Sequence, residues 1–235
     1  MIPLRDTVRS ARFPLVTVGL IGVNVLVFLM EINLSPRALE HFFQIWGIVP
    51  LRFTHPRLQS AGNYLTLLSS MFIHGGWMHI IGNMWSLWIF GDNVEDRMGR
   101  GAFLLFYLLS GLAAGAIHVV TNAASTVPTV GASGAIAGVM GAYLLLFPHS
   151  TVLTLVPVLF FLHVAEVPAV LFLGFWFLLQ LFSGTLALAA AGTQAGGVAW
   201  WAHIGGFVVG FLWAVPLRRQ QAITRHRRWR DDDDW

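Results

Sequence analysis

A few polar side chains lie within otherwise apolar stretches of the sequence, and their types are those of acyl-transfer chemistry. His79 and Asn83 are four residues apart, so they share one face of a helix. Ser133 and His203 lie in two later apolar stretches. A serine becomes a nucleophile when a neighbouring base takes its proton, and His203 is the candidate base. His79 and Asn83 can donate hydrogen bonds to a developing oxyanion, which is typically worth about 3–4 kcal/mol of transition-state stabilisation.

The glycines around these residues indicate how the serine and the histidine can meet. Ser133 lies in the run Gly131-Ala132-Ser133-Gly134, and His203 shares a helical face with Gly206 and Gly210. Small residues let two helix backbones approach closely. Taken alone, a glycine-serine face is more often a packing feature, and a lone membrane histidine is often an interhelical hydrogen-bond partner. Buried imidazole, amide and hydroxyl groups together are costly unless they are used, which favours a shared site.

A metal site and a permeation path are the competing interpretations of the same residues. His74, His79 and His203 can supply the three imidazoles of a catalytic zinc site. The sequence has no His-Glu-x-x-His motif, however, and it lacks the internal repeat of many transporters. Several carboxylates lie at the opposite ends of the expected helices: Asp92, Glu95, Asp96 and Glu166. We therefore expect a Ser-His dyad rather than a triad, with no metal and no cofactor.

The composition indicates a membrane protein. Of 235 residues, 56% are hydrophobic and only 11% are charged, and the mean hydropathy is +0.69. Soluble domains carry about a quarter charged residues, so a soluble fold is excluded, and so is a disordered chain. The chain has no cysteine, which excludes disulfides and thiol catalysis. The chain has no lysine, and nine of its fourteen arginines lie near the chain ends, which indicates membrane topology rather than nucleic-acid binding.

Six apolar stretches predict an all-α, polytopic membrane protein built as a six-transmembrane-helix bundle. The expected spans are 14–33, 76–93, 101–121, 131–147, 166–187 and 199–217, with Pro216 ending the last one. We expect the long segment 34–75 to be structured at the interface. Pro157 interrupts the apolar segment 149–165, which we interpret as an interfacial or re-entrant segment, a seventh helix being the alternative.

The distribution of arginines predicts the orientation of these spans. An even number of spans puts both termini on one side, and arginines precede the first span, follow the last and lie in the 2–3 connection. This side is therefore expected to be cytoplasmic, with residues 1–13 as an N-terminal segment, 14–217 as the helical domain and 218–235 as a charged tail. His79, Ser133 and His203 would then all lie roughly 3–6 Å below the outer ends of their helices.

With these residues in place, the sequence resembles the rhomboid family of intramembrane serine proteases. Three motifs carry the resemblance: His74-x4-His79-x3-Asn83, Gly131-x-Ser133-Gly134 and Ala202-His203-x-x-Gly206-x3-Gly210. They occur in that order on the second, fourth and sixth spans, and the resemblance covers residues 14–217. Glu95 and Gly99 also resemble the family's Glu-x3-Gly turn, a structural element.

The resemblance implies roles for the residues of the site. Ser133 would be the nucleophile and His203 the general base, while His79, Asn83 and the backbone N–H of Ser133 would form the oxyanion hole. His74, Gly131 and Gly134 would support them. The glycine-rich stretch 188–198 would be a mobile cap over the site, and 34–75 the membrane-dipping first loop. No cofactor is implied.

The resemblance also implies substrates, a location and one departure from the pattern. Substrates would be single-span membrane proteins, cut within or next to their transmembrane helix in the cell membrane. A catalytically inactive, rhomboid-like scaffold that binds transmembrane segments is the alternative. Many members carry an aromatic residue four positions after the nucleophile, where this chain has Ala137. We therefore expect a neighbouring tryptophan to orient His203. The sequence predicts no nucleic-acid partner and leaves the oligomeric state open.

Overall fold

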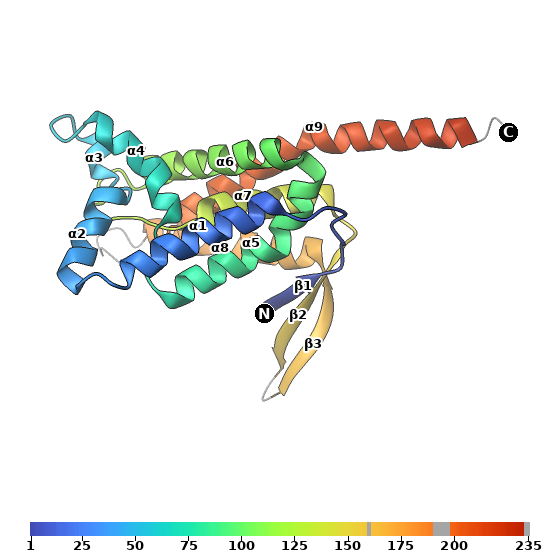
Figure 1. The fold of residues 1–235 in the computed structure, drawn as a ribbon, viewed down its shortest axis with the longest axis horizontal. Coiled ribbons are helices and arrows are strands. Elements are labelled where there is room, and N and C mark those ends of the chain that lie inside the picture. Colours follow the sequence, from blue (N-terminus) through green and yellow to red (C-terminus); the bar gives the residue numbers. More distant parts are fainter. Residues whose placement is uncertain (159–160, 190–197, 233–235) are drawn as a thin grey trace.

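The protein is a bundle of helices with a small sheet at one end (Figure 1). The computed structural model describes residues 1–158, 161–189 and 198–232. Helices occupy all six predicted stretches, although their bounds differ by a few residues and the last one runs further. They are α1 (Leu15–Glu31), α5 (Trp77–Met98), α6 (Arg100–Thr121), α7 (Ser133–Leu146), α8 (Ala169–Ala189) and α9 (Trp200–Asp232).

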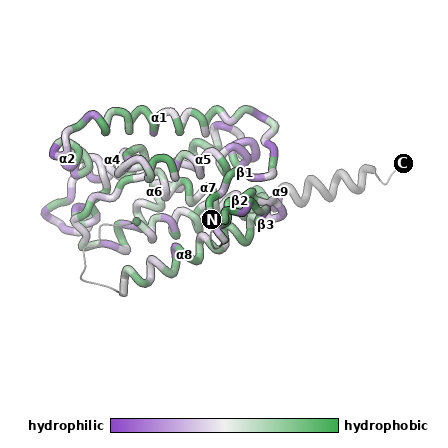
Figure 2. The backbone as a smooth tube through the Cα atoms, turned by 90° about the horizontal axis from the view of Figure 1, so that it is seen from below, coloured by the Kyte–Doolittle hydropathy of each residue, from purple (hydrophilic) through white to green (hydrophobic). Residues whose placement is uncertain are grey.

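By length and composition, three of the described helices are long and apolar enough to cross a membrane. They comprise Arg100–Thr121, Ala169–Ala187 and Trp200–Arg219, while Leu15–Glu31 and Ser133–Leu146 are shorter apolar helices. Figure 2 shows the apolar residues running along the helices and the sheet, with hydrophilic segments gathered in the turns at the two ends. The prediction that Pro216 ends the last helix is wrong, because α9 continues through it. A proline removes one backbone hydrogen bond and bends a helix, but the residues after it can continue the helix.

The segment between α1 and α5 is folded, as the sequence predicts. It contains α2 (Pro36–Trp46), α3 (Leu51–Thr54), α4 (Ala61–Ser69) and the 3-10 turn η1 (Ser70–Phe72). These short helices cover the end of the bundle opposite the sheet (Figure 1). Ser35 caps α2 by accepting a hydrogen bond from the Ala38 N–H at 3.4 Å, with Pro36 in the first turn.

Helix α7 is the centre of the bundle, and it packs against α9 backbone to backbone. All its residues from Gly134 to Tyr143 are buried, as expected for a helix that is apolar all round. A Cβ at Gly210 would overlap the carbonyl oxygen of Gly138, and one at Gly206 would overlap that of Gly134. The predicted close approach of the two glycine faces is therefore confirmed.

The start of α1 is held by a carboxylate from α5. Glu95 accepts hydrogen bonds from the N–H groups of Val16 at 3.0 Å and Thr17 at 2.7 Å, and from the Thr17 hydroxyl at 2.8 Å. The first N–H groups of a helix have no partner within the helix, so this carboxylate satisfies two of them. Gly99, with φ at +82°, then allows α5 to turn directly into α6.

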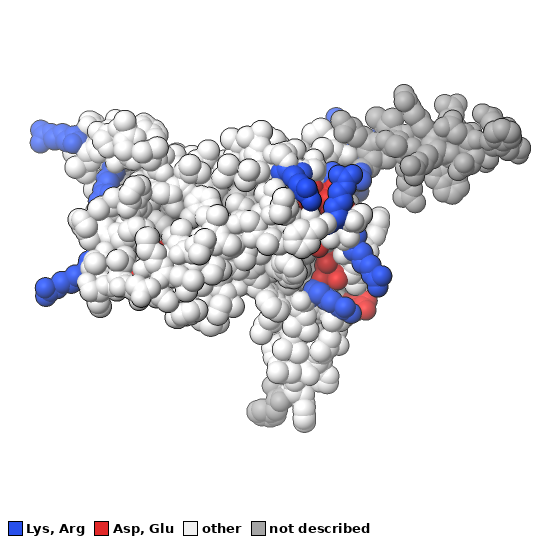
Figure 3. All heavy atoms as spheres, viewed as in Figure 1, with Lys and Arg blue, Asp and Glu red and all other residues white. Residues whose placement is uncertain are grey.

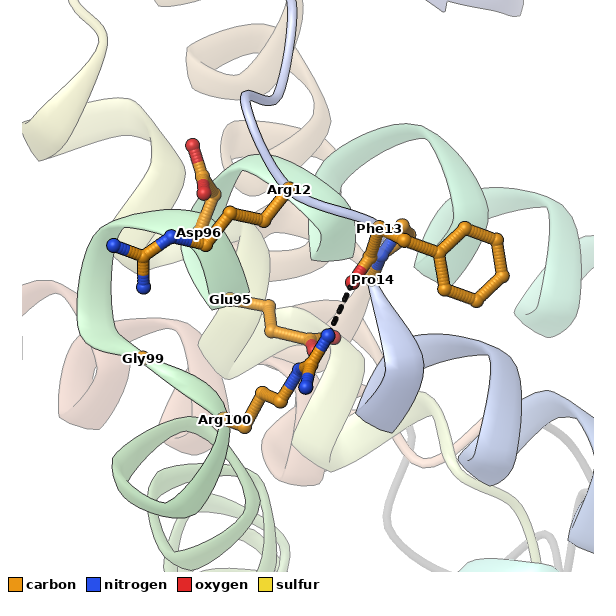
Figure 4. A pocket seen from close by; sticks show the side chains of 7 residues that line it. All are labelled: Arg12, Phe13, Pro14, Glu95, Asp96, Gly99 and Arg100. Carbon is orange, nitrogen blue, oxygen red and sulfur yellow. Dashed lines mark hydrogen bonds between the residues drawn. The ribbon is translucent and has the colours of Figure 1, made fainter.

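A cavity of about 250 Å³ lies beside this turn, far along the helices from Ser133. Figure 4 shows Arg12 and Arg100 at its walls, with Arg100 donating to the carbonyl oxygen of Phe13 at 3.4 Å. The structural role that the sequence suggests for Glu95 and Gly99 fits this geometry.

The fold is mostly helical, as predicted, but it is not all-α, because the chain also contains a three-stranded antiparallel sheet. Its strands are β1 (Ile2–Asp6), β2 (Thr151–Val158) and β3 (Phe161–Pro168), in the order β1-β2-β3. The apolar segment 149–165 is thus not a seventh helix; its described residues contain β2 and most of β3. Pro157 is tolerated because β1 pairs only with Val152–Leu155, so at Pro157 strand β2 has a partner on one side only.

The root of the sheet is fixed to the bundle by polar contacts. The Tyr143 hydroxyl of α7 donates to Asp6 at 2.5 Å, and the Asn93 side-chain amide of α5 donates to the same carboxylate at 2.8 Å. Burial raises the pKa of Asp6 above its ordinary value, and the hydrogen bond from Tyr143 opposes that shift. Because Asp6 belongs to β1, these contacts join the N-terminal strand to two helices of the bundle.

The contact between α7 and α9 can be tested with one added methyl group. We expect Gly210→Ala to lower the free energy of unfolding by about 1–3 kcal/mol, because the methyl group overlaps the Gly138 carbonyl and forces the helices apart. Thermal unfolding of the purified protein in detergent measures the effect. Gly174→Ala in α8 is the matched control, since no atom lies within 4 Å of a Cβ there. Equal unfolding temperatures for the two variants would contradict this account of the packing.

Candidate active site

Ser133 and His203 meet between α7 and α9. Ser133 is the first residue of α7, and His203 is the fourth residue of α9. The Nε2 atom of His203 lies 2.7 Å from the Oγ atom of Ser133, which is the distance of a hydrogen bond. His203 is buried and Ser133 is partly exposed. The hydroxyl can therefore reach a ligand while the imidazole stays enclosed.

The other nitrogen of His203 sets its tautomer. Nδ1 lies 2.8 Å from the side-chain oxygen of Gln180, which is buried on α8. An amide oxygen only accepts hydrogen bonds, so Nδ1 carries a proton and donates a hydrogen bond to Gln180. Nε2 is then unprotonated and accepts the hydroxyl proton of Ser133, which is the arrangement that a general base needs.

Gln180 is the residue that the analysis of the sequence missed. It is a polar side chain within the apolar stretch 166–187, which is the same signal that singled out His79 and Asn83. Trp176 of α8 lies beside the His203 ring, with centroids 5.9 Å apart and planes inclined by 32°. Trp200 meets the same ring edge-on at 6.4 Å. The neighbouring tryptophan expected in place of an aromatic at Ala137 is therefore present.

His79 lies beside Gly131, two residues before Ser133. The N–H of Gly75 donates to His79 Nδ1 at 3.3 Å, so in neutral His79 the proton is on Nε2. A Cβ at Gly131 would lie 2.7 Å from His79 Nε2 and 3.6 Å from Ser133 Oγ. Gly131 also has φ at +131°, which favours glycine. The residue is thus required by its backbone and by the space that His79 occupies.

Asn83 and His74 pair with each other. The side-chain amide of Asn83 donates to His74 Nε2 at 3.0 Å, and the rings of His74 and His79 meet edge-on at 5.1 Å. The backbone N–H of His74 contacts both carboxylate oxygens of Glu31, at 3.3 and 3.2 Å. Burial lowers the pKa of His74 to about 4, so the ring is neutral at physiological pH. The contact of Asn83 is with His74 rather than with Ser133.

The remaining predicted residues lie around this group. A Cβ at Gly134 would come within 2.7 Å of the Ala114 Cβ of α6, so this glycine serves the packing of α7. The cap expected at 188–198 falls almost entirely outside the described residues. In the part of the chain that the structure describes, no three His, Cys, Asp or Glu side chains are grouped to hold a metal ion.

The arrangement places a base, a nucleophile and hydrogen-bond donors around one point. The N–H of Ser133 lies in the first turn of α7, where backbone donors have no partner within the helix. A cavity of about 30 Å³ adjoins Ser133 and is lined also by His118 and Thr129. Such a volume is large enough for a water molecule. The chemistry that fits is attack of the serine oxygen on a carbonyl, with the negative charge stabilised beside it.

Comparison with known proteins identifies the family. The family model for the rhomboid domain matches residues 61–220, which include every residue of the site. The chain belongs to the rhomboid family. Rhomboid proteins are integral membrane proteins, and the family includes intramembrane serine proteases.

Several characterised sequences are similar to this rhomboid chain. Rhomboid protein 1, mitochondrial, of Saccharomyces cerevisiae is 29% identical over 88% of this chain and 58% of its own length. Rhomboid protease GluP of Bacillus subtilis is 33% identical over 56% of this chain and 24% of its own. Rhomboid-like protein 11, chloroplastic, of Arabidopsis thaliana is 32% identical over 49% of this chain and 39% of its own length. The chain thus spans less than two thirds of the length of these relatives.

The role of Gln180 can be tested through the reactivity of Ser133. We expect Gln180→Leu to slow the reaction of Ser133 with a fluorophosphonate probe about five- to tenfold, because a buried hydrogen bond that orients the base contributes about 1 kcal/mol. Gln180→Glu keeps the acceptor and should restore most of the rate, although burying its carboxylate is expected to lower the unfolding temperature. The control is Thr185→Val on the same helix, whose hydroxyl bonds only to carbonyls of α8. An unchanged labelling rate in Gln180→Leu would show that Gln180 does not position His203.

Proposed function

We propose that this protein is an intramembrane serine endopeptidase that cleaves single-span membrane proteins within or next to their transmembrane helix. The observation that carries the proposal is the 2.7 Å contact between Ser133 Oγ and His203 Nε2 in an apolar bundle. Membership of a family that includes serine proteases supports it. In this proposal Ser133 is the nucleophile and His203 the general base.

The proposed reaction is acyl transfer to serine and then to water. Ser133 Oγ attacks the scissile carbonyl while its proton moves to His203 Nε2, and the C–O bond forms as the carbonyl π bond opens. His203 then gives this proton to the leaving amine as the C–N bond breaks. In the second half, His203 takes a proton from water, whose oxygen attacks the acyl carbon, and returns it to Ser133. Gln180 keeps Nδ1 protonated throughout.

We assign the oxyanion to donors beside Ser133. His79 Nε2–H lies beside Gly131 and Ser133, and the N–H of Ser133 is free of helical partners. Asn83 is the third proposed donor, because its amide nitrogen bears a second proton besides the one donated to His74. Donors preorganised in this way cost no reorganisation as charge develops.

We also propose a topology in which α1 and α5 to α9 cross the membrane. Residues 14–217 would then form the catalytic domain, preceded by 1–13 and followed by the tail 218–235. The arginines at the sheet end of the bundle, among them Arg9, Arg12 and Arg100, favour a cytoplasmic location of both termini in a cell membrane. Ser133, His79 and His203 each lie within the first four residues of their helices. The site would thus open toward the outer face.

A rhomboid-like scaffold that binds transmembrane segments without cleaving them is the second candidate, since relatives with rhomboid-like names include proteins not named as proteases. The two functions differ in the reactivity of the serine. A fluorophosphonate should label the wild-type protein at Ser133 if the dyad is active, and it should not label a scaffold. The comparison of wild type with Ser133→Ala shows which residue reacts.

The proposed mechanism predicts complete dependence on both members of the dyad. We expect Ser133→Ala and His203→Ala each to reduce cleavage of a single-span model substrate in liposomes by at least about a thousandfold, since nucleophile and base act as a unit. Ser86→Ala is a matched control, because its hydroxyl bonds only to the Gly82 carbonyl of its own helix. A chelator should have no effect. Cleavage by Ser133→Ala at a rate near that of the wild type would refute the mechanism.

A further inference from the structure

The sheet projects sideways from the bundle instead of continuing along its axis. In Figure 1 the helices run horizontally, and the hairpin of β2 and β3 leaves the bundle at the end where α1 begins, roughly at right angles to the helices. Figure 2, seen from below, places the sheet within the length of the bundle. If the helices cross the membrane, the sheet lies beside them within the adjacent leaflet, where Pro3 of its edge strand contacts Trp85 near the middle of α5.

The part of the sheet far from the bundle is mostly apolar, with the exposed His163 on the same face as Phe161. Register places Ile2, Leu155 and Val164 side by side on one face, with Leu162 further out. Leu162, Val164 and Ile2 are 67%, 58% and 56% exposed. On the opposite face Phe161 is 71% exposed. A soluble protein rarely leaves such a contiguous apolar surface uncovered.

The charged residues of the sheet lie at its root, while His163, which is exposed, pairs with Val156 in the outer half. In register, Leu153 of β2 lies between Arg5 of β1 and Glu166 of β3. Glu166 also accepts a hydrogen bond from the Thr151 hydroxyl at 3.3 Å. Asp6 is held by Tyr143 and Asn93. In the space-filling view of Figure 3, the projecting part of the sheet shows no Lys, Arg, Asp or Glu below this root. The sheet therefore changes from charged to mostly apolar along its length, as a structure does that passes from a headgroup region into lipid.

The apolar surface of the sheet continues into the exposed surface of two helices. The indole N–H of Trp85 on α5 donates to the carbonyl oxygen of Pro3 in β1 at 2.6 Å. Trp85 and Trp88, near the middle of α5, are 45% and 54% exposed. On the other side, β3 runs directly into α8, where Leu171 is 64% exposed. Sheet and helices thus present one apolar surface.

The arginines at this end match the headgroups of a bilayer. Arg5, Arg9 and Arg12 are exposed in and after β1, and Figure 3 shows arginines gathered beside the root of the sheet. Basic residues at this level are attracted to anionic headgroups. We propose that the outer half of the sheet is inserted into the lipid of the adjacent leaflet, so that the three strands form a lateral membrane anchor for α5 and α8. The occupant of the apolar surface is phospholipid.

The absence of cysteine allows a direct test on the full chain. A nitroxide label is attached to Leu162→Cys in the protein reconstituted into vesicles of phosphatidylglycerol and phosphatidylcholine. Collisions of the label with oxygen, which partitions into lipid, are compared with those of a water-soluble nickel chelate. Leu178→Cys, 61% exposed on α8, is the reference for lipid, and Arg9→Cys is the reference for water. We expect the label at Leu162 to meet oxygen several-fold more often than nickel, as at Leu178.

Each other outcome overturns the proposal. Nickel accessibility equal to that at Arg9 would place the outer half of the sheet in water. Protection in vesicles that is lost in nanodiscs holding one copy would mean that a second copy covers the surface. The measurement is repeated in Ser133→Ala, so its result does not depend on whether the protein is a protease.

Discussion

The direct contact of two helix backbones is the constraint on which the rest of the structure depends. Helices α7 and α9 approach so closely that Gly206 and Gly210 leave no space for a Cβ against the carbonyls of Gly134 and Gly138. Ser133 and His203 extend from the same two helices, one turn from this contact. Their hydrogen bond of 2.7 Å is therefore a consequence of helix packing. Any side chain at these glycines would move His203 away from Ser133.

His203 and His79 are oriented by hydrogen bonds to neutral groups, and neither ring is bonded to a carboxylate in the described structure. His203 donates to the amide oxygen of Gln180, and His79 accepts the N–H of Gly75. Each neutral contact fixes one tautomer, so that Nε2 of His203 accepts and Nε2 of His79 donates. A neutral partner also avoids burying an unpaired charge, which would be costly in an apolar bundle. The one carboxylate near this group, Glu31, contacts the backbone of His74 instead.

The opposite end of the bundle is organised by two other carboxylates. Glu95 holds the start of α1, and Asp6 joins strand β1 to α5 and α7. Together they fix where the first helix begins and where the sheet leaves the bundle. The sheet in turn contacts the middle of α5 through Trp85 and continues directly into α8 at Ala169. The bundle thus has contacts centred on carboxylates at one end and the pair of Ser133 and His203 at the other.

The sequence by itself determined the helical stretches and the group of Ser133, His203, His79 and His74, because polar residues in apolar helices are costly and glycine faces indicate close packing. It also suggested the structural role of Glu95 and Gly99. It did not determine the sheet, because a short apolar run has the same composition in a strand, a re-entrant loop or a helix. That this run forms a strand was decided by its pairing with residues 2–6, which are far away in the chain. Gln180 and the pairing of Asn83 with His74 were likewise decided by tertiary structure, because a hydrogen bond depends on which helices become neighbours.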